Sequence, residues 1–337
     1  MTDTLDVVER RIAFPRVATY SSRRFWLEFM EQGGKMGVTI PFRRELDFRY
    51  GEVAEIGSGI RRVIANNPSP FTLHGTGTYI LGTGEVAVVD PGPADPNHIQ
   101  AILAALDGET ISHVLVTHTH MDHSPGCALL KQFSDAPTYA YGPHGAGKLE
   151  EGVSVEEGGD MEFVPDQLVR HGDVIEGGDW SVECVYTPGH TSNHICYQLR
   201  EAKALFSGDH VMGWSTSIIS PPDGDMLAYM NSLELLLDRD DDRYWPTHGP
   251  AIDDPKPHVR AFIEHRRERE RQILECVGKG VSHISDMVPL MYTETPEFMY
   301  PAAGRSVLAA VECLVARGDL ATDAAVSLSG AYRLGNL

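Results

Sequence analysis

One short stretch decides how this chain folds: THTHMDH at positions 117–123. It follows the apolar run 113–116, which predicts a short buried strand. Three imidazoles and one carboxylate stand within six positions, and these are the ligand types of a borderline-soft divalent cation. Alternate residues at a strand end can point into one cavity, so the stretch indicates a metal site rather than isolated structural histidines.

Three later segments offer further ligands: TPGHT at 187–191, SGD at 207–209 and PTHG at 246–249. Each segment follows a strand-like run and stands beside glycine or proline, the residues of sharp turns. Strand, tight turn and ligand therefore recur four times along the chain. This repetition predicts a site assembled along one edge of stacked sheets. The β-β-α-β-α order of the expected elements, with strands returning later, predicts two sheets sandwiched between helices.

The ordered set H-x-H-x-D-H, TPGH, SGD and a late His-Gly resembles the metallo-β-lactamase-fold hydrolases. The segment VVDPG at 88–92 also matches the first motif of that family, so the resemblance covers about residues 68–248. An ordered pattern of five parts is far more specific than any one of its parts. The resemblance implies an α/β fold of the metallo-β-lactamase type, which is a four-layer αβ/βα sandwich.

The resemblance further implies seven ligands shared between two metal ions. The first ion would be held by His118, His120 and His190, the second by Asp122, His123 and His248, and Asp209 would bridge the two. Asp90 is implied to orient the ligands of the first motif without binding a metal ion itself. His194 would act beside the ligands or substrate, or would pack beneath the cluster. His144 would contact substrate, or would be an ordinary loop histidine.

A ligand set of histidine and aspartate, without cysteine, suits zinc and tolerates manganese or iron. We therefore expect two divalent metal ions, with Zn2+ as the first choice and Mn2+ or Fe2+ as alternatives. Two such ions about 3.5–4 Å apart can share a bridging hydroxide that serves as a nucleophile near neutral pH. Asp122 would be the catalytic residue, because it would ligate one ion and orient that hydroxide. Oxygen-reducing diiron relatives carry glutamate where this chain has His120, and this departure favours hydrolysis.

The composition is that of a globular protein, with 337 residues, 42% apolar residues and a formal net charge of −20. Such a charge argues against a surface that attracts nucleic acid or anionic lipid. Five cysteines without CxxC spacing predict buried thiols in a reducing compartment rather than disulfides. We see neither a secretory signal nor an apolar run near about 18 residues, so we expect a cytoplasmic protein without membrane contact.

Three regions are expected along the chain. Residues 1–44 match nothing in the family pattern and predict either a loosely docked extension or a strap between two copies, which leaves a homodimer open. Residues 45–264 form the catalytic domain with the metal motifs, and residues 265–337 form a C-terminal domain. Within the catalytic domain, residues 226–237 predict an amphipathic helix. Its expected buried stripe is Leu227, Met230, Leu233 and Leu237.

The C-terminal domain is expected to be a winged-helix-like module. Helices are predicted at 256–277, 284–292 and 302–317, and β-like residues follow at 320–322 and 326–328. Such a module after a metal core resembles the lactamase-like-2 subgroup of the fold, whose animal members act as endoribonucleases. The alternating charges in the run from His265 to Arg271 predict a solvated, salt-bridged helix face.

The leading hypothesis is a metal-dependent hydrolase that acts on an ester, thioester or related acyl compound. The enzymatic alternative is an endoribonuclease or phosphodiesterase acting on single-stranded RNA, and a DNA-binding regulator is the alternative from another class. Residues 265–337 hold eight Lys or Arg and nine Asp or Glu, a net of −1, whereas a winged helix that binds nucleic acid usually presents a basic face. The expected partner is therefore a small-molecule substrate, with RNA as the alternative.

Overall fold

The computed structural model describes residues 39–145 and 158–335. The chain divides into two compact units, Met1–Gly37 and Val38–Leu337. The first unit, and with it most of the expected extension 1–44, lies outside the described residues. The second unit contains both regions for which separate domains are expected, so a boundary at residue 264 stays a prediction.

The first sheet contains seven strands that lie side by side in the order of the chain. They are β1 (Val53–Gly57), β2 (Ile60–Ile64), β3 (Gly77–Leu81), β4 (Glu85–Val89), β5 (Thr110–Leu115), β6 (Thr138–Ala140) and β7 (Gln167–Leu168). Neighbours from β1 to β4 are antiparallel, whereas β4 to β7 run parallel. Because parallel strands end at the same edge, the segments after β4 and β5 emerge next to each other.

The second sheet contains five strands in the order β12-β11-β10-β9-β8. They are β8 (Val174–Glu176), β9 (Ser181–Tyr186), β10 (Ile195–Leu199), β11 (Ala204–Gly208) and β12 (Arg243–Pro246), with the short 3-10 turn η1 (Arg200–Ala202) before β11. Strands β8 to β11 pair antiparallel, and β11 pairs with β12 in parallel. The carboxyl ends of β9, β11 and β12 therefore lie at one edge of this sheet.

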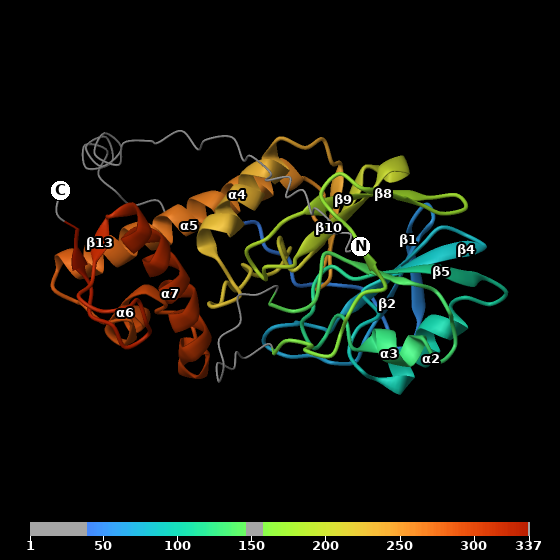
Figure 1. Cartoon of the computed structure of the whole chain (residues 1–337), viewed down its shortest axis with the longest axis horizontal. Coiled ribbons are helices and arrows are strands. Elements are labelled where there is room, and N and C mark those ends of the chain that lie inside the picture. The colour runs from blue at the N-terminus through green and yellow to red at the C-terminus, as the bar shows by residue number, and fades with distance from the viewer. Residues whose placement is uncertain (1–38, 146–157, 336–337) are drawn as a thin grey trace, which may run out of the picture. The chain divides into compact units, whose positions relative to one another are not determined.

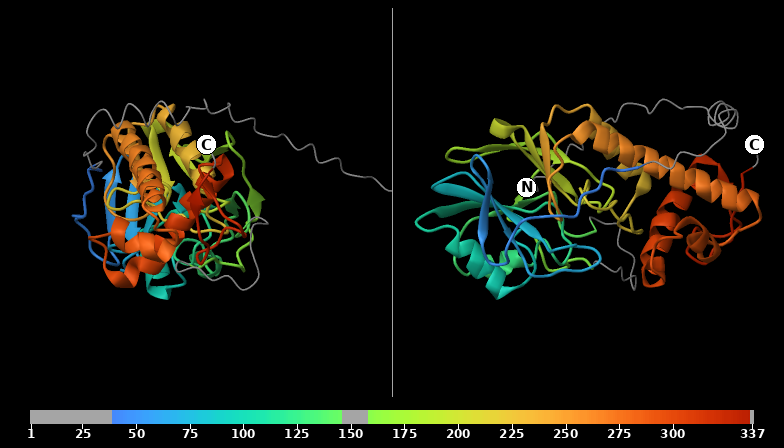
Figure 2. Two further views of the ribbon diagram at one scale, coloured as in Figure 1. Left: turned by 90° about the vertical axis from the view of Figure 1, so that its left-hand side faces the viewer. Right: turned by 180° about the vertical axis from the view of Figure 1, so that it is seen from behind.

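Helices cover the outer face of each sheet and give the second unit four layers (Figure 1). Helices α2 (Pro96–Ala104) and α3 (Gly126–Leu130) pack on the first sheet, and α4 (Met226–Leu237) and α5 (Pro255–Gly278) pack on the second. An apolar core fills the space between the sheets, with Tyr79, Leu115, Tyr197 and Phe206 among its members. Figure 2 shows the same order of layers from behind. The predicted αβ/βα sandwich is confirmed.

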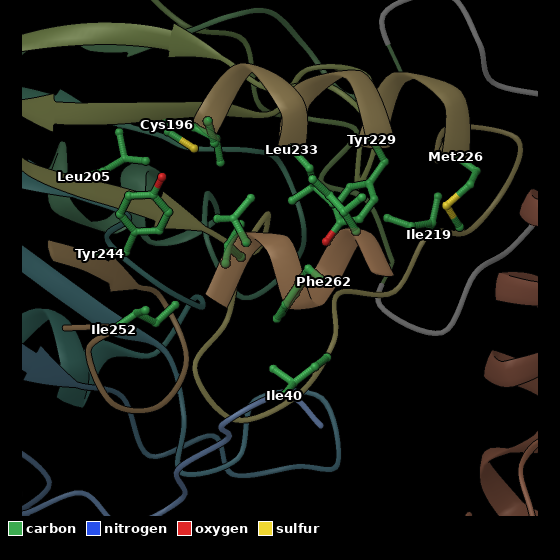
Figure 3. Close-up of a cluster of buried hydrophobic side chains, with 14 of the residues drawn as sticks. Ile40, Cys196, Leu205, Ile219, Met226, Tyr229, Leu233, Tyr244, Ile252 and Phe262 are labelled. Carbon is green, nitrogen blue, oxygen red and sulfur yellow. The ribbon is translucent and has the colours of Figure 1, made fainter. Parts of the chain in front are cut away.

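Helix α4 contributes the apolar side that joins the second sheet to α5. Figure 3 shows Tyr229 and Leu233 of α4 in one cluster with Phe262 of α5. The buried residues of α4 are Met226, Tyr229, Ser232, Leu233 and Leu236. The predicted stripe is wrong at Leu227, which is 53% exposed, whereas Leu233 is buried and Met230 and Leu237 are partly buried against the same cluster. The buried side includes Tyr229, which is fully buried and whose backbone lies against Gly189 in the turn that precedes His190.

The C-terminal region builds an apolar cluster of its own. It consists of the end of α5, α6 (Ile284–Met291), the 3-10 turn η2 (Glu297–Met299), α7 (Tyr300–Arg317) and a two-stranded sheet of β13 (Leu320–Ala321) and β14 (Arg333–Leu334). Members of the cluster include Ile273, Met287, Val311 and Leu314. Helices followed by a small sheet are the predicted order of elements, and the name winged helix stays an interpretation of that order.

The second strand of the small sheet is not at 326–328, where the sequence predicted it. It lies at Arg333–Leu334, where Leu334 pairs with Leu320. The backbone N–H of Ser327 donates to the Tyr332 hydroxyl at 2.9 Å, and that hydroxyl donates to the Ser327 carbonyl at 2.5 Å. Because a side chain satisfies both polar groups of this backbone, no neighbouring strand is needed there.

One helical stretch among the described residues, Glu297–Arg317, is long and apolar enough for a membrane span by length and composition, with a mean hydropathy of 1.2. Half of its apolar window, 50%, is buried inside the protein. Helix α7, which makes up most of it, supplies Val311 and Leu314 to the C-terminal cluster and Ala309 to the cluster on the second sheet. This is the burial pattern of a core helix.

Candidate metal centre

The four ligand-bearing segments meet where strands of both sheets end. The stretch 117–123 follows β5, His190 lies in the turn between β9 and β10, Asp209 directly follows β11, and His248 follows β12. The turn before His190 requires glycine, because Gly189 has a φ of +139° and a Cβ there would lie 2.3 Å from the Tyr229 Cα. Tight turns thus place each ligand at the same edge.

Three histidines form the first group of candidate ligands. The Nε2 atom of His118 lies 3.0 Å from Nδ1 of His120, and Nε2 of His190 lies 3.1 Å from that same Nδ1 atom. All three side chains are buried, and their nearest nitrogen atoms lie within 4.8 Å of one another. Three imidazole nitrogens that converge in this way fit the protein ligands of an open tetrahedral zinc site.

Asp122, His123 and His248 form the second group, again with ligand atoms within 4.8 Å. The Oδ2 atom of Asp122 lies 3.4 Å from Nε2 of His123 and 3.1 Å from Nε2 of His248. Asp209 lies between the two groups: its Oδ2 atom is 3.3 Å from Nε2 of His248 and 3.9 Å from Nε2 of His190. All seven predicted ligands therefore come together.

Two atoms of this cluster have no hydrogen-bond partner although they are buried. They are Nε2 of His123 and Oδ1 of Asp209, which lie 3.7 Å apart. A buried polar atom left without a partner costs about 1–3 kcal/mol, so such atoms call for a ligand. Imidazole nitrogen and carboxylate oxygen are both donors to zinc. The residues present therefore fit divalent metal ions.

The protonation states of the first group and of Asp122 suit ligation, whereas at His123 and His248 the charges of Asp122 and Asp209 outweigh burial and raise the pKa. Burial, followed by the neighbouring histidines, lowers the pKa of His118 and His120 well below its usual range, so both rings are neutral and offer lone pairs. Burial alone would raise the pKa of Asp122, but His123 and His248 outweigh it and hold that pKa well below its usual range. Neutral imidazoles beside ionised carboxylates are the forms that bind cations.

Asp90 holds the position that the resemblance implies. It is fully buried, and its backbone has a φ of +48°. Its Oδ1 atom accepts a hydrogen bond from the Thr117 N–H at 2.8 Å, and its Oδ2 atom accepts one from the Thr247 hydroxyl at 3.1 Å. Nδ1 of His123 lies 3.0 Å from Oδ2, so its proton faces Asp90 and Nε2 faces the centre. Asp90 thereby orients one ligand and the starts of two ligand segments.

The supporting threonines were not predicted. Thr117 and Thr247 each directly precede a ligand histidine, and that placement is a signal from which they could have been found. A further support is Thr78, whose hydroxyl donates to the Asp90 carbonyl at 2.6 Å and lies 2.7 Å from Nε2 of His98 on α2. The first sheet and its outer helix therefore hold the Asp90 backbone in place.

His190 is held by the segment that precedes α4. Its Nδ1 atom donates to the Ile218 carbonyl at 2.6 Å, which leaves Nε2 for the centre. The neighbouring Ser217 carbonyl accepts a hydrogen bond from the guanidinium of Arg266 on α5. Arg266 is only 5% exposed, so the predicted solvated face of residues 265–271 is wrong at this position. In the sequence, Arg266 belongs to a run of charged residues. It is buried because Tyr229 of α4 packs against its guanidinium group.

His194 and His210 lie beneath the cluster. The Nε2 atom of His194 accepts a hydrogen bond from the Asp209 N–H at 3.2 Å, and its Nδ1 atom lies 2.9 Å from the Thr187 hydroxyl. His194 therefore both packs under the ligands and holds the backbone of one of them. The ring of His210 lies 4.6 Å from that of Tyr229, outside the three ligand groups found among the described residues.

His144 lies beside the first ligand group rather than within it. Its ring is 6.1 Å from that of His120, and its Nδ1 atom is 2.9 Å from the Thr119 hydroxyl, which accepts from Asn193 Nδ2 at 2.8 Å. Gly159 leaves room for this ring, since a Cβ there would lie 2.1 Å from Nε2 of His144. The sequence predicts a loop rich in glycine and glutamate at 142–160, near the mouth of the site, and its residues 146–157 lie outside the described residues.

Known proteins share this sequence and arrangement. Residues 72–248 match the family model described as the metallo-beta-lactamase superfamily. The chain is 33% identical over 266 residues to a beta-lactamase-like protein 2 homolog of Drosophila melanogaster, covering 76% of this chain and 87% of that protein. It is 30% identical over 262 residues to an atrochrysone carboxyl ACP thioesterase of Cryptosporiopsis sp. (strain 8999), covering 72% of this chain and 75% of that protein.

The likeness of fold extends beyond the metal motifs. The crystal structure of a beta-lactamase domain protein from Burkholderia ambifaria matches with a TM-score of 0.69 and 21% sequence identity, covering 85% of this chain and 94% of that chain. This coverage is larger than the range matched by the family model. Sequence and fold agree, and the chain belongs to the metallo-beta-lactamase superfamily of hydrolases.

Proposed function

We propose that this hydrolase uses two divalent metal ions, zinc first, to cleave an ester, thioester or related acyl substrate. The observation that carries the proposal is the position of Asp209, whose carboxylate lies within 4 Å of ligand nitrogens from both groups. A carboxylate so placed would bind both ions. When bound, such ions supply an activated water molecule and polarise the carbonyl that it attacks.

Asp122 is the residue best placed to handle the proton of the attacking water. Its side chain is 22% exposed, whereas the side chains of His123, His190 and His248 beside it are at most 4% exposed. Its Oδ2 atom also accepts a hydrogen bond from the Thr76 hydroxyl at 3.1 Å, which fixes the rotation of the carboxylate. An ionised carboxylate at the open side of the centre would orient the water and take up its proton.

An acyl substrate is favoured over nucleic acid by two observations. One relative carries the name of a thioesterase, which is an acyl-cleaving activity. On α5 and α7, three arginines are paired with acidic neighbours, which weakens the basic face that nucleic acid requires. These ion pairs are Arg267–Glu264, Arg271–Glu268 and Arg317–Glu270.

The proposal is tested by a panel of substrates offered to the metal-loaded protein: thioesters, esters, lactones, phosphodiesters and single-stranded RNA. We expect turnover of an acyl compound that is lost on treatment with a chelator and restored by zinc. Cleavage of RNA without cleavage of any acyl compound would contradict the acyl assignment and favour the endoribonuclease alternative.

A further inference from the structure

A small crevice lies where α4, α5, α6 and α7 meet, and two arginines of α5 line it. We call it the arginine crevice; it is bordered by Arg266, Arg269, Tyr292, Ser306, Glu270 and Met226, among others. Its cavity volume is about 10 Å3, which is the room that one water-sized group occupies. It is therefore a place for a single atom or the tip of a larger group.

The two arginines of the crevice lack acidic partners among the residues that the structure describes. Each has a buried Nε–H without any hydrogen-bond acceptor. The other donors of Arg266 and Arg269 reach only neutral oxygens: the Ser217 carbonyl for the first, and the Met291 carbonyl and the Gln272 side chain for the second. A buried cation that no anion neutralises is costly, so its presence calls for a bound counter-charge.

Aromatic rings hold both guanidinium groups in place without cancelling their charge. Arg266 lies over the ring of Tyr229 at 5.1 Å, and Arg269 lies over the ring of Tyr292 at 4.3 Å. The two cations are three positions apart on one helix and border the same small space, so they repel each other. A site that fixes two like charges side by side is prepared for an anion.

The acidic residue at the crevice does not satisfy these arginines. The carboxylate of Glu270 is held by both terminal nitrogens of Arg317, with N–O distances of 3.2 and 2.8 Å. Glu270 is therefore engaged by a third arginine, which it shares with Asp319. Since the chain as a whole carries a net charge of −20, a crevice with two unmatched positive charges stands out from its surroundings.

The start of α4 links the crevice to the turn that bears a candidate metal ligand. Met226, which lines it, is the first residue of α4, and the preceding residue Asp225 donates its backbone N–H to the Gly189 carbonyl at 2.9 Å. Gly189 directly precedes His190. Arg266 is also tied to the Ser217 segment that supports His190. The start of α4 thus lies between the candidate metal centre and the arginines.

We infer that the arginine crevice binds a terminal carboxylate of the acyl substrate while the carbonyl that water attacks lies at the metal centre. A carboxylate oxygen matches the size of the cavity, and a guanidinium fork recognises this planar group through paired N–H donors. A phosphate shares the charge but is bulkier. The inference rests on the proposed acyl hydrolysis and adds to it the substrate class: acyl groups that end in a carboxylate.

The kinetic test compares two thioesters of N-acetylcysteamine that differ at the far end of the acyl chain: butanoyl and glutaryl. We expect the wild-type enzyme to have the higher kcat/KM for the glutaryl compound. Arg269→Met should lower that preference about tenfold or more, mainly through a higher KM for the glutaryl compound. Arg269→Lys keeps the positive charge but lacks the guanidinium fork. Its preference for the glutaryl compound should therefore lie between those of the wild-type enzyme and Arg269→Met. Equal kcat/KM values for both compounds in the wild-type enzyme would overturn the inference.

Arg267→Met is the matched control, because Arg267 lies on the same helix but is exposed and paired with Glu264. It should retain the full glutaryl preference. If Arg267→Met lowered the preference as much as Arg269→Met, the effect would be one of general charge and the crevice assignment would be wrong. Thermal unfolding of each variant shows whether the fold is kept, and loss of the fold in Arg269→Met makes Arg269→Lys the deciding variant.

A second readout does not depend on hydrolysis. Calorimetric titration of glutarate into the metal-free full-length chain should show binding that Arg269→Met weakens about tenfold or more and that Arg267→Met leaves unchanged. Absence of binding, or binding that Arg269→Met does not weaken, would overturn the inference. Tighter binding of inorganic phosphate or of a single-stranded RNA than of glutarate would overturn the carboxylate assignment. Failure of all acyl hydrolysis with intact glutarate binding would refute the proposed function alone.

Discussion

The metal centre and the arginine crevice satisfy their buried charges in opposite ways. In the metal centre, acidic and imidazole groups from separate segments face one another, and Asp90 and the Ile218 carbonyl fix two of the rings from outside. In the crevice, two cations come from a single helix and face no acidic partner among the described residues. The first arrangement suits cations, and the second suits an anion.

This difference indicates how the two regions would bind different groups of one substrate. A carbonyl oxygen is weakly basic and suits metal ions, whereas a terminal carboxylate suits guanidinium groups. Helix α5 links the two regions, because Arg266 both lines the crevice and supports the segment that holds His190. Changes in either region, and in the helix between them, therefore test the comparison.

The largest effect is expected from Phe262→Ala, which removes the apolar contact between α5 and the rest of the sandwich. Phe262 is fully buried in the cluster on the second sheet. Truncation of such a residue lowers the free energy of unfolding by about 3–5 kcal/mol. Urea unfolding measures this loss, and the same substitution at the exposed Phe298, which is 70% exposed, should change stability little. Equal losses in both variants would mean that α5 is not part of the common core.

Asp122→Ala should reduce turnover by about 100-fold or more, because it removes the carboxylate that orients the water and accepts its proton. At least one metal ion should stay bound, since the first group of three histidines is intact. Turnover and metal content are measured on the same sample. Wild-type turnover would refute the role of Asp122 and weaken the contrast between the two regions.

Arg266→Met should weaken metal binding by about 10–100-fold at one of the two sites. The affected ion is the one at His190 or the one that the wild-type protein holds more weakly. The Ser217 carbonyl loses its donor, so the adjacent Ile218 carbonyl no longer fixes Nδ1 of His190. Competition with a chromophoric chelator measures the affinities, with Arg267→Met as control. Wild-type affinity for two metal ions in Arg266→Met would show that the crevice and the metal centre are independent.

The smallest effect on stability is expected from His98, which contacts the Thr78 hydroxyl that donates to the Asp90 carbonyl. Burial lowers the pKa of His98 to about 4, so the folded state keeps the ring neutral while the unfolded state takes up a proton below about pH 6.5. The stability from this group is present above pH 6.5 and is lost as the pH falls toward 4. Between pH 6.5 and 5.5 the loss is about 1 kcal/mol. His98→Gln should reduce the fall in unfolding free energy over that interval by this amount, and an unchanged fall would contradict the assignment.

The metal centre could be predicted from the sequence because each ligand has a local signature. A histidine or aspartate beside a turn residue, after a strand, is visible without knowledge of the partner segments. The two groups and the position of Asp90 follow from such signatures and from the family resemblance. What the sequence did not predict is burial that depends on distant segments.

The arginines of α5 illustrate this limit. In the sequence, Arg266 stands in a run of alternating charges that is typical of a solvated face. It is buried because Tyr229 and Ser217, each more than thirty positions earlier in the chain, pack against it. The buried side of α4 was mistaken for the same reason, since Ser232 lies inward to donate to the Pro188 carbonyl at 2.8 Å. Local polarity does not indicate such contacts.

The central claim is that seven side chains bind two metal ions, and anomalous diffraction at the zinc edge from crystals of the zinc-loaded protein tests it most directly. The account predicts two peaks, one within bonding distance of His118, His120 and His190 and the other of Asp122, His123 and His248, with Asp209 between them. A single peak, or peaks away from these residues, would contradict it.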